Sequence, residues 1–520
     1  MFLRQVDERS HPIDDRRRPR CPLGRAAIAA TLVFVVAAVL RLPSCFESFW
    51  LDELHSAWSV WGTLGDVMPR AAAGNQTPIY FWGLWLWKQV AGESEVLLRL
   101  PSVLASSLAA ALVTYGIARH RGDLMAAIIG GLVLAAEANS LFYGTELRPF
   151  AFAMLFGAVA CYVVTSDSMK HGRKLLWLVL ILTISGLFQP TSIGVLGWLV
   201  AAQCLWMKWH RSDSLVAAYK IRWYGWAALA ISLPAFVWLS GGVLIEAWSH
   251  RQQWQTMGQA DSLRQLAEIW PWGTLVVIPA CLAWGGRLWF TRFENGSQAL
   301  PWWCLASVAM LATLTFWAFS ATGMAPVFHR RYFIACLPIL AWVTGDALSN
   351  RLTFKMSERT ALMVLAIAFL PLVTLLIDQG TAKKGFTPTT PLVRRGEGWR
   401  EAVAWLNLHT PPETVVYLNP GLIESTRLLD QEHEEGAAYA QWYLTNPLKG
   451  PYRRSKVIAF DRRAKPRPAL PIVIRGTRAT AESWLRHLND GKLHENQVIR
   501  SFGSVQLIEN GPPELPAAQY

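Results

Sequence analysis

Charged residues are scarce in this chain. Of its 520 residues only 16% are Asp, Glu, Lys or Arg, whereas 52% are hydrophobic, and a soluble domain carries about 25% charged residues. Tryptophan is abundant, with 27 residues, and indole rings favour the membrane–water interface because they are apolar with one N–H to hydrate. The shortage of charge argues against a soluble globular protein and predicts a polytopic membrane protein.

Cysteines are also few, and their number, seven, is odd. None forms a Cys-x-x-Cys pair or a Cys/His cluster with zinc spacing, so neither a disulfide framework nor a structural zinc site is indicated. We interpret all of them as small core hydrophobes. They are Cys21, Cys45, Cys161, Cys204, Cys281, Cys304 and Cys336.

Motifs for nucleotide-driven and hydrolytic chemistry are missing as well. The sequence contains no Gly-x-x-x-x-Gly-Lys-Ser/Thr, no Gly-x-Gly-x-x-Gly after a strand, no His-Glu-x-x-His and no Gly-x-Ser-x-Gly. A formal net charge of +13 can indicate nucleic-acid binding, but the Lys and Arg residues fall largely in short gaps between apolar runs. We therefore expect no nucleic-acid partner, and a donor that reaches an outer-face site would more naturally be carried by a lipid.

Long apolar runs are what the sequence has in place of these features. A membrane span needs roughly 20 apolar residues, and we mark about eleven such segments. The first follows a basic N-terminus and lacks a cleavage site, so we interpret it as an uncleaved span. The predicted spans are residues 26–42, 96–118, 124–140, 151–164, 175–188, 193–209, 223–244, 269–290, 302–321, 332–348 and 361–377.

Basic clusters occur in alternate gaps between these spans. If residues 1–25 lie in the cytoplasm, every later gap on the same side is basic, from Arg-His-Arg at 119–121 to Arg-Leu-Thr-Phe-Lys at 351–355. The positive-inside rule therefore predicts a multi-pass protein of the plasma (inner) membrane with a cytoplasmic N-terminus. An odd number of spans places the C-terminal tail and the outer loop 43–95 on the opposite face.

The composition changes beyond the last predicted span. Residues 379–396 are a Gly/Pro/Thr/Lys linker, and residues 397–520 alternate short β-branched runs with helical segments, which predicts a small extracytoplasmic α/β domain. The expected fold is therefore an all-α polytopic bundle with a C-terminal α/β domain. In this division a basic cytoplasmic N-terminus (1–25) precedes the membrane domain (26–378), which contains the outer loop 43–95.

An acid pair, Asp52 and Glu53, opens the outer loop in the stretch Ser-Phe-Trp-Leu-Asp-Glu-Leu-His-Ser-Ala-Trp. Asp52 can be the N-cap of a helix, where it would satisfy free N–H groups. It can also be a general base or a carboxylate that orients an acceptor hydroxyl. Partial desolvation beside Phe49 and Trp50 would raise its pKa and make it a better base. The two roles do not exclude each other.

Glu146 and Arg148 lie where a span emerges on the same outer face, in Tyr-Gly-Thr-Glu-Leu-Arg-Pro-Phe. One interpretation is an interfacial salt bridge with a snorkelling arginine. The other is a binding site, in which Arg148 holds a phosphate and Glu146 orients that phosphate or a sugar hydroxyl. The following proline suits the first position of the next helix.

A second basic cluster, His329, Arg330 and Arg331, departs from the positive-inside pattern because it also falls on the outer face. The planar fork of arginine bonds two phosphate oxygens at once, so this cluster suits a phosphate monoester or diphosphate. Arg99, just before the second span, has the same alternatives as Arg148.

The motifs, taken in order, resemble those of the polyprenyl-phosphate-sugar-dependent membrane glycosyltransferases of the GT-C fold. That group includes protein O-mannosyltransferases, the aminoarabinose transferases that modify lipid A and the galacturonic-acid transferases of lipopolysaccharide. The acid pair is followed by TPIYFW, SEVLLRLPSVL, YGTELRPFAFAM and, late in the chain, HRRYFIACLP. The resemblance covers roughly residues 41–376 and is richest in motifs between 50 and 152.

This resemblance implies a bundle that moves a sugar from a polyprenyl-phosphate carrier to a lipid, glycan or protein acceptor on the non-cytoplasmic face. It assigns Asp52 as the catalytic base or acceptor-orienting acid and Glu53 as its partner. Where the family usually has Pro-Pro-x-Tyr-Tyr, this chain has Thr77 and Phe81 at the first and last positions. Together with the outer-face residues described above, the resemblance gives a set of expected contacts to the substrate or the lipid phosphate. They are Tyr80, Arg99, Glu146, Arg148, His329, Arg330, Arg331 and Tyr332.

Other functions predict other patterns. No metal is required by this scheme, but an acid pair can bind Mg²⁺ or Mn²⁺, so a divalent cation is left open. A transporter or lipid-sugar flippase would place ionisable residues near the bilayer midplane, whereas here they mark the ends of spans. A third alternative is a non-catalytic scaffold whose working part is the C-terminal domain.

Overall fold

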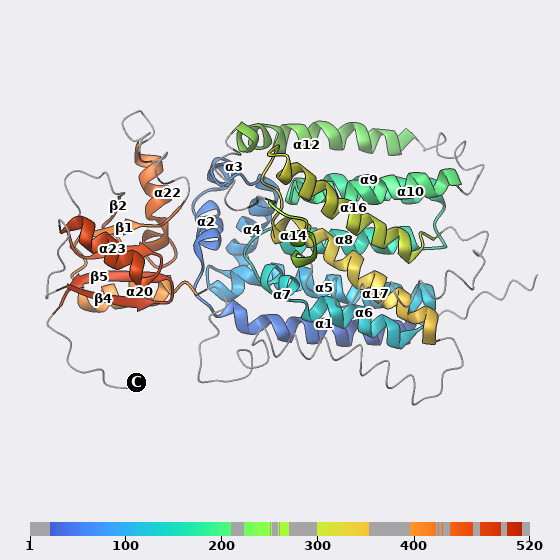
Figure 1. Cartoon of the computed structure of the whole chain (residues 1–520), viewed down its shortest axis with the longest axis horizontal. Coiled ribbons are helices and arrows are strands. Elements are labelled where there is room, and N and C mark those ends of the chain that lie inside the picture. Colours follow the sequence, from blue (N-terminus) through green and yellow to red (C-terminus); the bar gives the residue numbers. More distant parts are fainter. Residues whose placement is uncertain are drawn as a thin grey trace, which may run out of the picture.

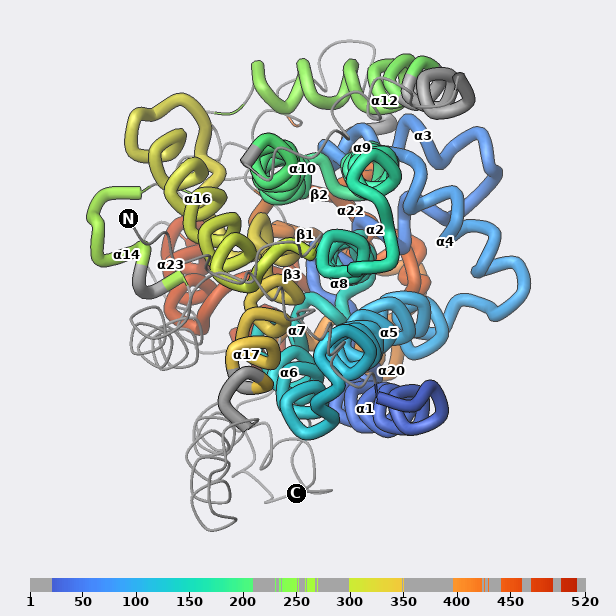
Figure 2. The backbone as a smooth tube through the Cα atoms, turned by 90° about the vertical axis from the view of Figure 1, so that its right-hand side faces the viewer, coloured from blue at the N-terminus to red at the C-terminus, as the bar shows by residue number. Residues whose placement is uncertain are grey.

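The computed structural model describes residues 21–209, 223–249, 251, 258, 260–269, 299–352, 396–422, 425, 429, 437–460, 469–489 and 497–511. Figure 1 shows an elongated molecule in which long helices run side by side and a smaller part built of strands and helices lies at one end. Seen end-on in Figure 2, the helices form a bundle in which α8 lies near the centre, beside α5 and α9.

The bundle is built from helices of very different length. They are α1 (Leu23–Cys45), α5 (Glu95–Arg121), α6 (Leu124–Ala136), α7 (Ala138–Gly144), α8 (Phe150–Thr165), α9 (His171–Phe188), α10 (Ser192–Trp209), α12 (Trp223–Ser249), α14 (Arg264–Glu268), α16 (Trp302–Ala321), the 3₁₀ helix η3 (Arg330–Cys336) and α17 (Leu337–Leu352).

Four helices in the described part of the chain, α1, α5, α9 and α16, are long and apolar enough to cross a membrane. The pair α6 and α7 makes a fifth candidate if it is one span bent by 60°. The protein is thus a helical membrane bundle with several apolar spans, as its composition predicts. The predicted span 361–377, and 269–290 beyond its first residue, lie outside the described residues, so the total of about eleven stays a prediction.

Two predicted spans have a different local structure. Residues 124–140 are not one straight helix, because the Glu137 carboxylate accepts a hydrogen bond from Ser140 N (2.6 Å) and starts α7 as a new helix. Residues 332–348 begin as the 3₁₀ helix η3, and the α-helix starts only at Leu337. Pro338 explains that start, since proline lacks the N–H that the first turn of a helix leaves unbonded.

The outer loop contains three helices, α2 (Leu51–Ser59), α3 (Leu64–Ala73) and α4 (Pro78–Ala91). Acidic residues lie in the first turns of α2 and α3, where they interact favourably with the helix dipole. Pro78 occupies the first position of α4, a position that suits its fixed φ angle.

The C-terminal region is a mixed five-stranded sheet with helices, as its alternating pattern predicts. The strand order is β2-β1-β3-β5-β4, with β1 parallel to β2 and β3, and β5 antiparallel to β3 and β4. The edge strand β4 was not among the strands predicted from the sequence. The elements are α20 (Trp399–His409), β1 (Val416–Asn419), α22 (Ala437–Lys449), β2 (Val457–Ala459), β3 (Ile472–Arg475), α23 (Arg478–Leu488), β4 (Gln497–Phe502) and β5 (Val505–Asn510).

The α/β region and the outer loop share a hydrophobic core. One cluster of buried side chains contains Phe49 and Leu54 from the outer loop together with Trp399, Val416 and Leu507 from the α/β region. Such a contiguous cluster holds two parts of a chain together as one packed unit. The α/β region therefore sits directly on α2, the helix that carries the acid pair.

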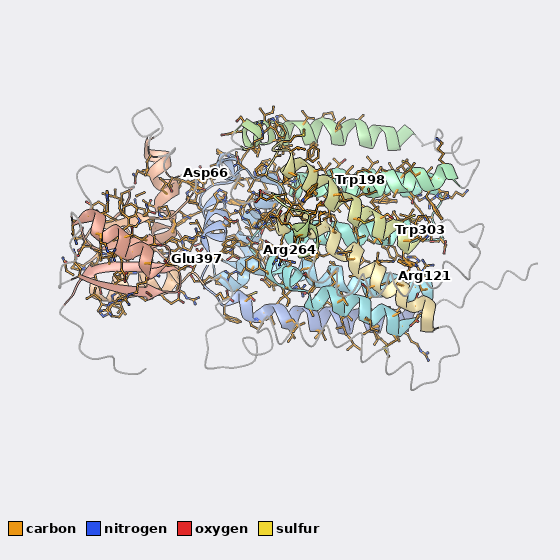
Figure 3. The ribbon with its side chains drawn as sticks, viewed as in Figure 1. Asp66, Arg121, Trp198, Arg264, Trp303 and Glu397 are labelled. Atoms are coloured by element: carbon orange, nitrogen blue, oxygen red, sulfur yellow. The ribbon has the colours of Figure 1, made fainter. Side chains whose placement is uncertain are left out.

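The opposite end of the bundle carries a basic cluster. Arg121 ends α5 and donates a hydrogen bond to Asp346 of α17 (2.7 Å). Figure 3 shows Arg121 at the end of the helices that lies away from the α/β region. The predicted cytoplasmic cluster and the predicted outer domain thus lie at opposite ends of the bundle. The basic gaps, which alternate along the sequence, require this separation.

Candidate active site

A pocket lies where the outer loop, the helical bundle and the α/β region meet. Five residues of the predicted site line it together: Asp52, Glu146, Arg148, His329 and Arg331. They come from α2, from the loop between α7 and α8, and from the start of η3. The structure thus brings together side chains that the sequence could place only on the same membrane face.

Asp52 lies between two guanidinium groups. Its Oδ2 atom is 3.4 Å from Arg148 Nη2 and 3.6 Å from Arg331 Nη1. The side chain of Asp52 is 27% exposed, and those of Arg148 and Arg331 are 9% and 20% exposed. These are partly desolvated charges, so their mutual attraction is stronger than that of surface ion pairs.

The interpretation of Asp52 as an N-cap is wrong, because the N-cap of α2 is Trp50 and Asp52 lies inside the first turn. The expected rise in its pKa is wrong too. Burial does raise the pKa of Asp52, but the positive charges of Arg148 and Arg331 outweigh it, so the pKa lies below its ordinary value. Asp52 is therefore an ionised carboxylate at neutral pH.

Arg148 has donors left over for an anion. Its Nε and Nη1 atoms are buried and have no hydrogen-bond partner among the described residues. A buried donor without an acceptor costs about 1–3 kcal/mol, and an anion that enters the pocket would remove this cost. Arg148 directly precedes Pro149, the N-cap of α8.

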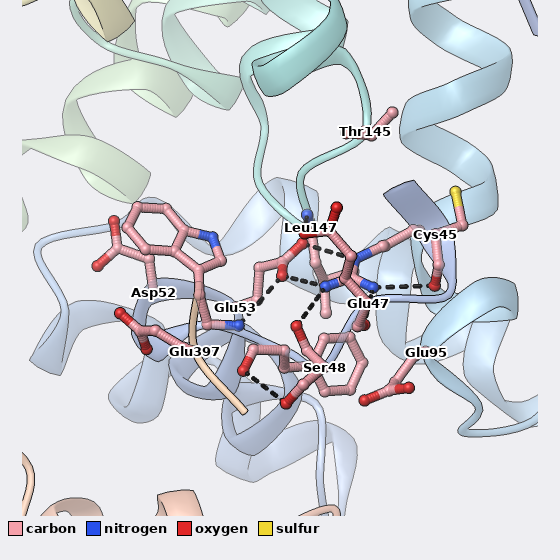
Figure 4. A network of polar contacts seen from close by, with 12 residues as sticks. Cys45, Glu47, Ser48, Asp52, Glu53, Glu95, Thr145, Leu147 and Glu397 are labelled. Atoms are coloured by element: carbon pink, nitrogen blue, oxygen red, sulfur yellow. Dashed lines mark hydrogen bonds and ion pairs between the residues drawn. The ribbon is translucent and has the colours of Figure 1, made fainter. Parts of the chain in front are cut away.

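Glu53 and Arg99, two further predicted site residues, bind each other instead of lining the pocket. Both side chains are fully buried, and Arg99 donates to both carboxylate oxygens of Glu53, with Nε–Oε1 at 2.8 Å. Glu53 Oε1 also accepts from Leu147 N at 2.9 Å, and Arg99 Nη1 donates to the carbonyls of Cys45 and Glu47 (Figure 4). The pair joins α1, α2, α5 and the loop that precedes Arg148.

The remaining predicted residues lie beside the pocket lining. Arg330 is exposed. The ring of Tyr332 lies 5.1 Å from the guanidinium carbon of Arg331. Tyr80 is buried in α4, where its ring packs edge-on against Phe152.

His55 is a pocket residue that was not among those predicted from the sequence. It lies one helical turn after Asp52 and lines the same pocket, which the spacing of three residues on a helix could have indicated. His55 Nε2 is 3.0 Å from the carbonyl oxygen of Arg70. Because a carbonyl only accepts, Nε2 carries the proton of the neutral ring. Burial and the charge of Arg148 lower the pKa of His55 to about 3.

His329 has a similar environment. Burial, together with the charges of Arg331 and Arg330, lowers its pKa to about 4. Its Nδ1 atom accepts a hydrogen bond from Arg331 N at 3.3 Å and so starts η3. At neutral pH both histidines of the pocket are therefore uncharged, and the arginines supply its positive charge.

The α/β region provides residues that sequence analysis did not assign. Tyr443 and Asn446 of α22 and Arg475 at the end of β3 line the pocket opposite the bundle. Nothing in their local sequence points to the pocket, because their position depends on how the α/β region docks. Within the described residues, no group of three or more His, Cys, Asp or Glu side chains is arranged as metal ligands.

A helical membrane bundle with a C-terminal α/β region is a fold that this chain shares with a solved membrane protein. The chain matches the crystal structure of ArnT from Cupriavidus metallidurans bound to undecaprenyl phosphate with a TM-score of 0.52 at 15% identity, over 96% of this chain and 100% of that chain. The apo state of ArnT gives a TM-score of 0.50 at 14% identity, over 93% and 98% of the two chains. The resemblance predicted from the motifs is confirmed in the fold.

A relative among curated proteins agrees with this match. The chain is 26% identical over 320 residues to undecaprenyl phosphate-alpha-4-amino-4-deoxy-L-arabinose arabinosyl transferase 2 of Pseudomonas fluorescens (strain Pf0-1). The similar segment covers 57% of this chain and 54% of the relative, so the chain spans about half the length of the curated relative it matches. No protein-family model matches the chain.

Proposed function

We propose that this protein is a glycosyltransferase of the inner membrane. It transfers a sugar from a polyprenyl-phosphate carrier to an acceptor on the non-cytoplasmic face, with residues 1–25 in the cytoplasm and the α/β region outside. The observation that carries the proposal is the position of Asp52 between Arg148 and Arg331 in one pocket. The likeness to a structure bound to undecaprenyl phosphate and to an arabinosyl transferase supports a lipid-phosphate donor.

In this mechanism the carrier phosphate is the leaving group. The acceptor oxygen or nitrogen attacks C1 of the sugar, the bond from C1 to the phosphate oxygen breaks, and the phosphate leaves with the electron pair. Arg148 and Arg331 bind the phosphate, where negative charge increases in the transition state. Arg148 offers two donors that have no other partner among the described residues.

Asp52 accepts the proton of the acceptor. In the free protein two arginines hold its pKa low, which makes it a weak base. A bound phosphate would neutralise part of their charge, and the pKa of Asp52 would then rise because burial remains. Donor binding thus prepares the base for the reaction.

The direct test compares cell-envelope lipids and glycans from a strain without the gene after complementation with wild type, Asp52→Asn or Asp261→Asn. Mass spectrometry should find one sugar modification with wild type and Asp261→Asn, whose side chain is exposed and does not line the pocket, and none with Asp52→Asn. Equal modification by Asp52→Asn and wild type would refute the proposed role of the pocket. The mass difference would identify the sugar and the acceptor.

A further inference from the structure

A carboxylate of the α/β region binds the start of the helix that carries Asp52. Glu397 precedes α20 and is 5% exposed. Its Oε2 atom accepts hydrogen bonds from Leu51 N at 2.9 Å and from Trp399 Nε1 at 2.8 Å, and its Oε1 atom accepts from Arg475 Nε at 2.8 Å. Figure 3 shows Glu397 at the junction between the α/β region and the bundle.

The contact with Leu51 affects α2 directly. Leu51 is the first residue of α2, and the first N–H groups of a helix have no acceptor within the helix. A carboxylate in this place satisfies such a group and interacts favourably with the helix dipole. It also fixes the residue next to Asp52 in the chain.

Two other side chains of the α/β region bind the same segment on either side. The Tyr452 hydroxyl accepts a hydrogen bond from Phe49 N at 2.8 Å. Asn446 Nδ2 donates to the carbonyl oxygen of Leu54 at 2.8 Å. The backbone around the acid is therefore held from the α/β region before and after it.

We propose that Glu397 is a positioning residue for sugar transfer, which holds the start of α2 so that Asp52 faces Arg148 and Arg331. The inference rests on the proposed function. Asp52 lies 3.4 and 3.6 Å from the two guanidinium groups, so a small shift of α2 would break both contacts. A displacement of about 1 Å can lower a catalytic rate by about 100-fold.

The Glu397 carboxylate also binds a residue that lines the pocket on the side of the α/β region. Arg475 lines the pocket and is bound through its Nε atom to Glu397. One acidic side chain therefore connects the helix of Asp52 to a pocket residue of the α/β region. The α/β region is in this way part of the active site, although it supplies no residue to the acid–arginine cluster.

The test measures release of undecaprenyl phosphate from undecaprenyl phosphate-alpha-4-amino-4-deoxy-L-arabinose by the full-length protein in liposomes that contain a lipid extract of the source membrane. In Glu397→Ala we expect kcat to fall about 10- to 100-fold while KM for the donor changes by less than about 3-fold. Glu397→Gln keeps an oxygen acceptor for Leu51 N and should recover part of the rate. The matched control, Glu413→Ala, removes an exposed acid of the same region and should keep wild-type kcat.

The pH profile separates positioning from simple docking. Asp52 faces Arg148 and Arg331, with His55 on its own helix and His329 and Tyr143 nearby. If Glu397→Ala moves Asp52 away from Arg148 and Arg331, the pKa of Asp52 rises. The fall of kcat/KM on the acidic side of its pH profile, the acidic limb, then moves to higher pH. A docking role alone would lower the melting temperature and leave kcat and this limb unchanged, which would overturn the inference.

A second pair of variants tests the contact without changing Glu397. Leu51→Pro removes the N–H at the first helical position, where proline is tolerated, and Leu51→Ala removes the side chain but keeps the N–H. We expect a larger loss of kcat in Leu51→Pro than in Leu51→Ala, and equal values would contradict the proposal.

Wild type and Asp52→Asn are run in the same assay. An inactive wild type would refute the proposed function for this donor, whereas an active wild type with a normal Glu397→Ala would refute only the positioning role.

Discussion

Arg148 Nη2 lies 3.4 Å from Asp52 Oδ2, although the two residues belong to different elements, the loop before α8 and the first turn of α2. Arg331, from a third element, reaches the same oxygen atom at 3.6 Å. Two cations around one anion leave a net positive charge, which suits a phosphate.

The arginines control the pKa of Asp52, and this can be measured. Because Arg148 helps to hold that pKa below its ordinary value, wild-type kcat/KM should show no loss from protonation of Asp52 above about pH 4. In Arg148→Gln the burial of the acid remains while one cation is lost, so the acidic limb should move to higher pH. Arg148→Lys keeps the charge and should keep the limb near its wild-type position. An unchanged limb in Arg148→Gln would show that another group sets it.

Arg330 and Arg331 are adjacent in sequence but differ in position, which makes them a matched pair. Arg331 lines the pocket and contacts Asp52, whereas Arg330 is exposed. Loss of a donor to the developing negative charge costs about 100- to 1000-fold in rate, so Arg331→Gln should lower kcat/KM for the lipid donor by about that factor. Arg330→Gln should stay within a few-fold of wild type. Similar losses in both variants would mean that the two side chains share the phosphate.

The Glu53–Arg99 pair should support stability more than chemistry. Both side chains are fully buried, and removal of one partner of such a pair costs about 3–5 kcal/mol because the other charge is left buried. Glu53→Gln and Arg99→Met should each lower the melting temperature in detergent strongly. The double variant Glu53→Gln/Arg99→Met should be destabilised by less than the sum of the two single variants. Strictly additive losses would contradict the pairing.

His55 predicts a decrease in stability at acid pH. Its pKa is about 3 in the folded protein and about 6.5 when the chain is unfolded. The unfolded state therefore binds more protons below pH 6.5, and stability is lost as the pH falls from about 6.5 towards 3. His55→Gln can still donate to the Arg70 carbonyl but does not titrate, so it should lose about 2 kcal/mol less than wild type between pH 7 and 4.5. Thermal unfolding at several pH values measures this, and parallel curves would contradict it.

Much of the fold follows from local patterns. Apolar runs predict helices because the length of a span depends only on the membrane thickness. Among the described residues helices occupy most of the predicted spans, and residues 124–140 form two helices broken at Glu137. The short β-branched runs after residue 396 likewise predict strands. The edge strand β4 (Gln497–Phe502) was missed, since its residues alternate weakly between buried and exposed positions.

For the site, the sequence by itself was enough to predict which residues face one membrane surface. Counting the predicted spans assigns Asp52, Arg148 and Arg331 to that surface, because each crossing reverses the direction of the chain. Only the tertiary structure decided that these three side chains meet in one pocket and that Glu53 turns away from it to bind Arg99. Packing between elements far apart in the chain sets those contacts.

The α/β region shows the same division. Its strands and helices could be predicted from residue patterns, but its contacts with α2 through Glu397 and Asn446 could not. The lowered pKa of Asp52 also depends on distances between elements, because burial and neighbouring cations act in opposite directions. Local sequence reports what a segment can form, whereas the balance of charges in a pocket depends on which segments pack around it.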